Sequence, residues 1–327
     1  MKKNISIILT MSLLLCLTVF NASAGSLSEK NTLNNYEISI IKAQGKIFKK
    51  STAEIAESIL SKAGMGEKNI AMLTEEQLAD IADCTQITKT TEYCKYSEAD
   101  EKEYKLTKKE FNDGLAAVKQ EEESYIKSGG NEIHYSSTDN YFIKNLYIYK
   151  TLNAPSGTYG IMASFEWKNF TLTFRGTDVI SLSGENLVFE KNSFGLAVNL
   201  RAVEVISNSI TSTTNIKEFP EFKDYKDNNV WHSQNAIAYK YKLPKNLPGT
   251  NYSLTYTSAD FLIMCRARVS NPTIMTTFNV FAEYHHQKIT FLGSLSITAN
   301  GMGVSVSPKI FFKNFQITTD DAIVYYP

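Results

Sequence analysis

The chain has 327 residues, carries 34 Lys and Arg against 34 Asp and Glu, and is 43% hydrophobic with 12% aromatic residues. This composition excludes a collagen-like, low-complexity or wholly disordered chain. The neutral charge balance argues against a nucleic-acid partner, because such a partner requires a basic surface that neutralises phosphates. The length fits one or two globular domains, each able to bury a hydrophobic core.

The N-terminus has the three parts of a secretory signal peptide. The cationic start Met1-Lys2-Lys3-Asn4 precedes an uncharged stretch over residues 5–20, and Ala22-Ser23-Ala24 supplies the small-x-small cleavage pattern. A transmembrane anchor is the weaker alternative, because the uncharged stretch is shorter than the ~20 residues that span a bilayer. We therefore predict a signal peptide over residues 1–24, cleavage before Gly25, and a secreted or cell-envelope-associated protein without a stable membrane anchor.

Three cysteines follow this segment, in a compartment that permits disulfide bonds. Cys84 and Cys94 flank nine residues of polar character, and a disulfide closes a loop of this length easily. We predict a Cys84–Cys94 disulfide, with two free thiols as the alternative. Cys265 ends the apolar run that begins at Phe261 and is expected to be buried as a small hydrophobic residue.

The composition changes near Gly129-Gly130. Residues 25–130 hold 34 charged and 7 aromatic side chains, whereas residues 131–327 hold 32 charged and 30 aromatic side chains. All 7 prolines lie in the second region. We therefore predict a charged, mainly helical region over residues 25–130 and an aromatic-rich β-domain over residues 131–327.

The first region contains three helix start signals. Ser51-Thr52-Ala53-Glu54, Thr74-Glu75-Glu76-Gln77 and Thr107-Lys108-Lys109-Glu110 each place a hydroxyl residue three positions before Glu or Gln, which is the pattern of a capping box. Gly64 is a suitable helix stop between the first two. These signals predict a helical hairpin, followed by a third helix that ends near Ser128.

The second region follows the two-residue period of β-strands. Ile237, Tyr239 and Tyr241 alternate with polar or small residues, and a second alternating run over residues 252–257 follows a turn. Further short alternating or apolar runs continue to the C-terminus. We predict an α+β protein in which the small helical region precedes an antiparallel, jelly-roll-like β-sandwich.

No motif of catalysis is recognisable. The sequence has no Gly-x-Ser-x-Gly elbow, Walker loop or His-Glu-x-x-His pattern, so we predict no catalytic residues, no cofactor and no metal. Glu283 and His285 share a strand face and provide two potential zinc ligands, but no third ligand is identifiable. The oxygen-rich loop Asp224–Asn229 lacks the regular spacing of a calcium loop, which favours a solvated loop.

Two further segments leave alternatives open. Arg175 and Asp178 follow a predicted strand and form either part of a rim or a local turn. The hydroxyl-rich segment Ser207–Asn215 is of a type found in β-pore toxin hairpins, although a plain polar loop explains it better.

The best candidate ligand-binding cluster comprises Trp231, His232, Gln234 and Asn235. It follows a charged loop, which places it at the rim of a sandwich, where binding loops gather. An indole face with amide groups beside it suits a sugar ring or an aromatic side chain. The alternative is that Trp231 belongs to the core.

These features together resemble a known group of proteins. The order of signal peptide, helix–Gly–helix unit over residues 64–81, Phe165-Glu166-Trp167 and Phe174-Arg175-Gly176-Thr177-Asp178 resembles exported, uncharacterised proteins of Gram-positive (Firmicutes) gut bacteria. The resemblance implies export. It implies no site residues, because the group has no known activity.

The sequence favours a non-enzymatic binding protein whose partner is a surface glycan or another extracellular protein. A secreted hydrolase acting on carbohydrate is the first alternative, although no carboxylate pair is identifiable. A membrane-inserting, toxin-like protein is the second. The oligomeric state does not follow from the sequence.

Overall fold

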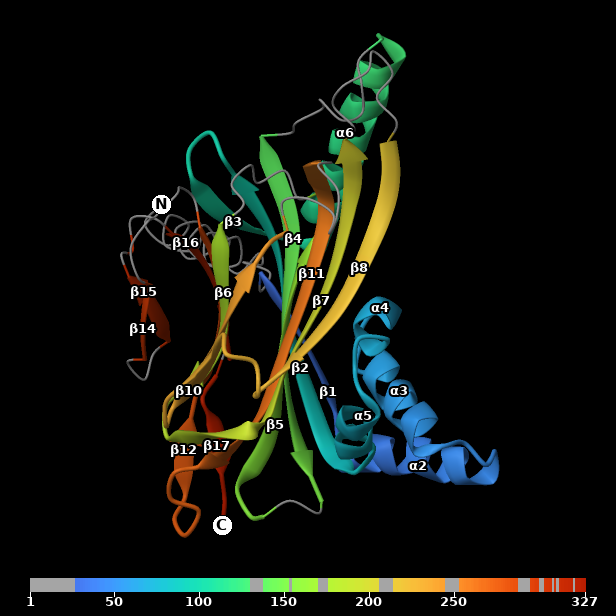
Figure 1. Ribbon diagram of the computed structural model, residues 1–327. Coiled ribbons are helices and arrows are strands. Elements are labelled where there is room, and N and C mark those ends of the chain that lie inside the picture. Colours follow the sequence, from blue (N-terminus) through green and yellow to red (C-terminus); the bar gives the residue numbers. More distant parts are fainter. Residues whose placement is uncertain are drawn as a thin grey trace, which may run out of the picture.

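The fold is a sandwich of antiparallel sheets with helices against the outer face of the larger sheet (Figure 1). A computed structural model describes residues 27–129, 138–152, 155–169, 176–205, 214–244, 253–287, 295–299, 303–307, 309, 312–319 and 321–327. The mostly antiparallel β architecture that the sequence predicts is confirmed. The expected signal peptide and its cleavage site lie outside the described residues.

The larger sheet has eight strands, of which seven follow the order β1-β2-β4-β5-β11-β7-β8. Strand β3 pairs with β2 beyond the end of β1, so β1 and β3 lie in tandem along one edge. The strands are β1 (Ser28–Leu33), β2 (Cys84–Ser97), β3 (Lys102–Leu106), β4 (Asp139–Thr151), β5 (Thr158–Trp167), β7 (Leu187–Val205), β8 (Thr214–Asp224) and β11 (Ser253–Val269).

The smaller sheet has five strands in the order β16-β13-β6-β10-β9. Two short two-stranded sheets, β12-β17 and β14-β15, lie beside it (Figure 1). The strands are β6 (Thr177–Gly184), β9 (Val230–His232), β10 (Ala236–Lys242), β12 (Thr276–Phe278), β13 (Val280–Gln287), β14 (Ser296–Ala299), β15 (Val304–Ser307), β16 (Phe312–Thr318) and β17 (Ile323–Tyr325).

Strand β11 shows why some strands are apolar throughout. Phe261, Ile263 and Cys265 enter the core between the two sheets, whereas Leu262 and Met264 pack under the helices. Because both faces of the strand are covered, both sets of alternate residues are apolar. The expected burial of Cys265 is confirmed.

Helices cover the outer face of the larger sheet. Helices α2, α3 and α5 pack on residues of β4, β5 and β11, and α6 packs on Tyr93 and Tyr141 through Phe111. Capping boxes form at Ser51, Thr74 and Thr107, as predicted. The helices are α2 (Asn35–Ile47), α3 (Thr52–Lys62), α4 (Glu67–Ile70), α5 (Glu75–Ala82) and α6 (Lys108–Lys127).

The helical part differs from the expected two-helix hairpin. The one-turn helix α4 lies between α3 and α5, and a fourth helix, α2, precedes them. Over the described residues, no helix is both long enough and apolar enough to cross a membrane.

The larger sheet continues across residue 130, where the composition changes. Strand β2 belongs to the charged region 25–130, yet it pairs along its whole length with β4, which belongs to residues 131–327. Besides its helices, the first region therefore supplies three strands to the larger sheet. The polar composition of β2 concealed this strand, since its alternate residues include several threonines and lysines.

Candidate functional site

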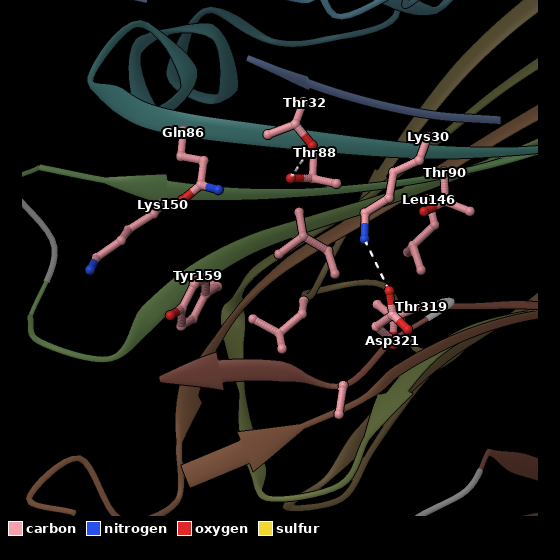
Figure 2. A pocket seen from close by; sticks show the side chains of 13 residues that line it. Lys30, Thr32, Gln86, Thr88, Thr90, Leu146, Lys150, Tyr159, Thr319 and Asp321 are labelled. Carbon is pink, nitrogen blue, oxygen red and sulfur yellow. Dashed lines mark hydrogen bonds and ion pairs between the residues drawn. The ribbon is translucent and has the colours of Figure 1, made fainter. Parts of the chain in front are cut away.

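A groove lies at the open edge of the sandwich, between the inner face of the larger sheet and the chain near the C-terminus (Figure 2). Its volume is about 270 Å³. Strands β1, β2, β4 and β5 provide one wall, and residues 319 and 321–323 provide the other. The lining residues are Lys30, Thr32, Gln86, Thr88, Thr90, Leu146, Ile148, Lys150, Tyr159, Thr319, Asp321, Ala322 and Ile323.

One wall of the groove is a row of hydroxyl groups. Thr88 and Thr90 are alternate residues of β2, so their side chains share one face of the strand. Thr32 is the register partner of Thr88 on β1, and the two hydroxyl oxygens lie 3.2 Å apart. Each hydroxyl group can both donate and accept a hydrogen bond. This wall therefore suits a ligand with peptide or sugar oxygen and nitrogen atoms.

The floor of the groove is apolar. Leu146, Ile148 and Tyr159 belong to the core cluster between the sheets, and they reach the groove where that core ends. Burial raises the pKa of the Tyr159 hydroxyl, and nearby Tyr325 adds to the shift. Tyr159 therefore stays neutral and can present both a ring face and a hydroxyl group to a ligand.

Charged side chains lie at the mouth of the groove. The Lys30 ammonium nitrogen lies 3.7 Å from an Asp321 carboxylate oxygen, and both side chains are exposed to solvent. Lys150 is exposed at the opposite end of the lining in Figure 2. Two ammonium groups against one carboxylate give the mouth a small positive excess.

A buried ion cluster continues the same faces of β2 and β4. Glu92 lies two residues after Thr90, and Lys144 lies two residues before Leu146. The Lys144 ammonium nitrogen lies 2.8 Å from Glu92 Oε2 and 2.6 Å from Glu103 Oε1. It also donates a hydrogen bond of 2.6 Å to the backbone carbonyl of Gln316, and its side chain is 1% exposed. Lys144 therefore links the two sheets next to the groove.

The charge state of Lys144 follows from its neighbours. Burial alone lowers the pKa of this ammonium group, but Cys94, Glu103 and Glu92 outweigh that effect and raise the pKa above its usual value. The oxygen and sulfur atoms of Glu92, Cys94 and Glu103 lie close enough together to hold a metal ion. The ammonium groups of Lys144 and of Lys105, which also contacts Glu92, together balance the two carboxylates, so this cluster fits a structural role better than a metal site.

The predicted cluster at residues 231–235 lies at the edge of the smaller sheet opposite β16. The Trp231 side chain is partly buried against the apolar residues under β14 and β15. His232 Nε2 lies 3.0 Å from the Phe189 carbonyl oxygen, and the backbone carbonyl of Gln234 accepts from the Phe189 amide. Asn235 accepts a hydrogen bond from Ser233. Trp231 and His232 are adjacent on a strand, so they face opposite ways.

The predicted disulfide is wrong. Cys84 and Cys94 are both free and buried, and both lie on strand β2. An extended strand rises about 3.3 Å per residue, so ten residues separate the two sulfur atoms by roughly 30 Å. Cys84 packs under the helices, whereas Cys94 lies in the core between the sheets.

Glu283 and His285 share the outer face of β13, as predicted. Glu283 accepts hydrogen bonds from Asn314, Gln316 and the backbone amide of Val304, and its Oε2 lies 3.7 Å from His285 Nε2. Through these hydrogen bonds, the Glu283 carboxylate connects β13 to strands β15 and β16. The described residues provide no third metal ligand beside this pair.

Asp178 is a buried acceptor rather than a rim residue. Its carboxylate accepts from the Tyr284 hydroxyl at 2.5 Å and from the Gln287 amide at 3.0 Å, and it lies 3.1 Å from His286 Nδ1. Arg175 and residues 207–213 lie outside the described residues.

The predicted solvated loop at residues 224–229 uses its carboxylates internally. Asp224 accepts from the Lys226 amide, and Asp227 accepts from Asn229 and from the Tyr239 hydroxyl. The bonds from Lys226 and Asn229 are turn contacts, and the bond from Tyr239 ties the loop to strand β10.

No protein-family model matches the chain, and no curated protein matches its sequence. Among solved structures, the membrane-inserted form of the Clostridium perfringens NetB toxin is 7% identical, with a TM-score of 0.22, over 54% of this chain and 89% of that chain. The collagen-binding subdomain of the Enterococcus faecalis surface protein ACE is 10% identical, with a TM-score of 0.24, over 51% and 92%. The Clostridium perfringens delta-toxin is 9% identical, with a TM-score of 0.20, over 71% and 88%. Similarity this low assigns neither a family nor a function to the chain.

Proposed function

We propose that the protein is a non-enzymatic binding protein that acts outside the cell, and that the groove beside strand β1 holds an extended polypeptide segment of an extracellular partner. Export rests on the N-terminal pattern over residues 1–24. The observation that carries the binding role is the position of the hydroxyl-lined groove next to an open strand edge.

Strand β1 can accept another strand. It pairs with β2 through Ser28–Leu33, and no other described strand pairs with it. Four of its six residues are exposed. An edge strand presents unpaired backbone N–H and C=O groups, and an extended peptide can add to them as a further strand.

The groove would then supply specificity. Lys30 and Thr32 are alternate residues of β1 and both line the groove, so an added strand would direct every second side chain toward the same opening. The threonine wall can bond to polar side chains, and the Leu146 and Tyr159 floor can hold apolar ones. Lys30 and Lys150 favour an acidic residue at the mouth.

Peptide arrays and surface glycans, screened with the purified protein, provide the test. A peptide that binds should protect the β1 amides from hydrogen exchange. Thr88→Val and Thr90→Val keep the side-chain shape but remove the hydroxyl groups, and each should weaken binding by roughly 5-fold or more, because a lost hydrogen bond costs about 1 kcal/mol or more. Trp231→Ala serves as the comparison variant.

Each outcome has a defined meaning. Peptide binding that depends on Thr88 and protects β1 supports the proposal. Loss of binding in Trp231→Ala, with both threonine variants unaffected, would instead place the site at residues 231–235. Glycan binding without β1 protection would reject the peptide class, and release of product from a glycan would reject the non-enzymatic role.

A further inference from the structure

Two adjacent bulky apolar side chains protrude from the end of helix α2. Ile47 is 75% exposed and Phe48 is 73% exposed. Tyr36 and Ile40 extend the apolar stripe along the solvent side of the same helix. The turn after α2 lies at the far end of the helical layer, away from both sheets (Figure 1). Exposed apolar groups gathered in this way mark an interaction surface.

Lysines surround these two residues. Lys46, Lys49 and Lys50 are exposed, and none of the three forms an ion pair with another described residue. We call residues 46–50 the α2 tip. The tip itself carries no carboxylate, although the Lys50 ammonium donates a hydrogen bond of 3.1 Å to the Ser58 hydroxyl and lies near Glu54.

The backbone gives the tip a defined shape. The Lys49 amide bonds to the Lys46 carbonyl, and the Lys50 amide bonds to the Gly45 carbonyl, which together end the helix. Lys49 has a φ of 53°, in the left-handed region that helix ends usually fill with glycine. The turn therefore projects Phe48 and a lysine side chain from adjacent positions.

A hollow behind the tip has the same chemistry. It lies between α2 and α3, has a volume of about 580 Å³, and includes Ile40, Ile41 and Phe48 in its lining. Lys50 and Lys62 also line it, together with one carboxylate, that of Glu37. Apolar and cationic groups therefore meet on this side of the tip as well as at its end.

We propose that the α2 tip docks the protein on an anionic membrane surface, with Ile47 and Phe48 inserted at the headgroup level and the three lysines against lipid phosphates. A protruding apolar tip among lysines fits a deformable, negatively charged bilayer. The lysines also disfavour a second copy of this tip, because like charges would meet. This surface is separate from the groove and does not depend on the proposed peptide binding.

Two labelled variants of the full chain test the proposal. Phe48→Cys and Met275→Cys each carry one environment-sensitive fluorophore, and Met275 is a matched control because it is 62% exposed on a distant loop. Cys84, Cys94 and Cys265 are buried, and Cys16 is replaced by Ser in both variants, so the new cysteine alone should react. The probes are vesicles of phosphatidylcholine, with or without phosphatidylglycerol.

The label at position 48 should shift to the blue with phosphatidylglycerol vesicles only, and the label at position 275 should not shift. Replacing Lys46, Lys49 and Lys50 together by Gln should weaken vesicle binding on the order of 100-fold, because each lysine near an anionic surface contributes about 1 kcal/mol. Raised salt should act in the same direction.

Three results would overturn the proposal. Failure to bind anionic vesicles is the first. The second is binding without a shift at position 48, which would show attachment through another segment, including residues 1–24. The third is a shift at position 48 that grows with protein concentration in the absence of vesicles, which would identify a second copy as the partner.

Discussion

Replacing Lys144 by Met should destabilise the protein strongly, because it leaves two carboxylates without their buried counter-charge. Removing one partner of a buried ion pair costs about 3–5 kcal/mol. Glu92 keeps its contact with Lys105, and Glu103 is 20% exposed and partly hydrated, so the low end of that range applies. We expect a loss of about 3 kcal/mol in the free energy of unfolding, measured by urea denaturation at neutral pH.

Lys105→Met is the matched control for this experiment. Lys105 contacts the same Glu92, but its side chain is 47% exposed. A solvent-accessible pair contributes about 1 kcal/mol or less. If Lys144→Met lowers the free energy of unfolding no more than Lys105→Met does, burial does not strengthen the Lys144 contacts. Adding Glu92→Gln and Glu103→Gln to Lys144→Met should restore part of the loss, because the unpaired charges are then removed.

Three further predictions concern the thiols, a buried carboxylate and a helix cap. Burial raises the pKa of Cys84 and of Cys265 to about 12. A thiol reagent at mildly alkaline pH should therefore label none of Cys84, Cys94 and Cys265 in the folded protein and all three after denaturation. If only one of these thiols were labelled in denaturant without reductant, the other two would be joined by a disulfide after all. Burial raises the pKa of Asp260 to about 6 from an unperturbed 3.8, so the folded state binds this proton more tightly than the unfolded state. Its stabilising effect is full below about pH 4 and is lost as the pH rises through about 6, a loss of up to about 3 kcal/mol. Asp260→Asn should flatten the urea-derived stability over that range, and an unchanged pH profile would exclude Asp260 as its source. Thr74→Ala should cost about 1 kcal/mol, because the Gln77 amide loses its acceptor at the start of α5; the exposed Thr273→Ala, measured in the same way, should cost less than half as much, and equal losses would contradict the capping role.

Local signals in the sequence were sufficient for three of the helix starts and for the β architecture, but not for the start of α2 at Asn34. A capping box joins residues only three positions apart, so Ser51, Thr74 and Thr107 could be identified without knowledge of their surroundings. The alternation along residues 237–241 likewise identifies a strand, whose Ile237, Tyr239 and Tyr241 share the face that enters the core between the sheets.

Strand β2 shows where local signals fail. Its threonines and lysines face partly toward the groove and partly toward the helices, so its composition resembles a polar loop. Spacing along the sequence then suggested a loop closed by Cys84 and Cys94. The extended backbone instead holds these thiols on one strand, far apart.

The candidate groove and the ion cluster depend entirely on tertiary structure. Lys30, Thr88 and Asp321 are far apart in the chain and meet only because β1 pairs with β2 and the C-terminal segment crosses the same edge. Lys144 likewise meets Glu92 through strand pairing and Gln316 through the packing of the two sheets. The sequence alone determined which residues cap helices and which alternate in strands, since those interactions act over a few residues. Only the pairing and packing of the sheets decided which polar side chains came together. A period of two shows which residues share one face of a strand, but not which residues pack against that face.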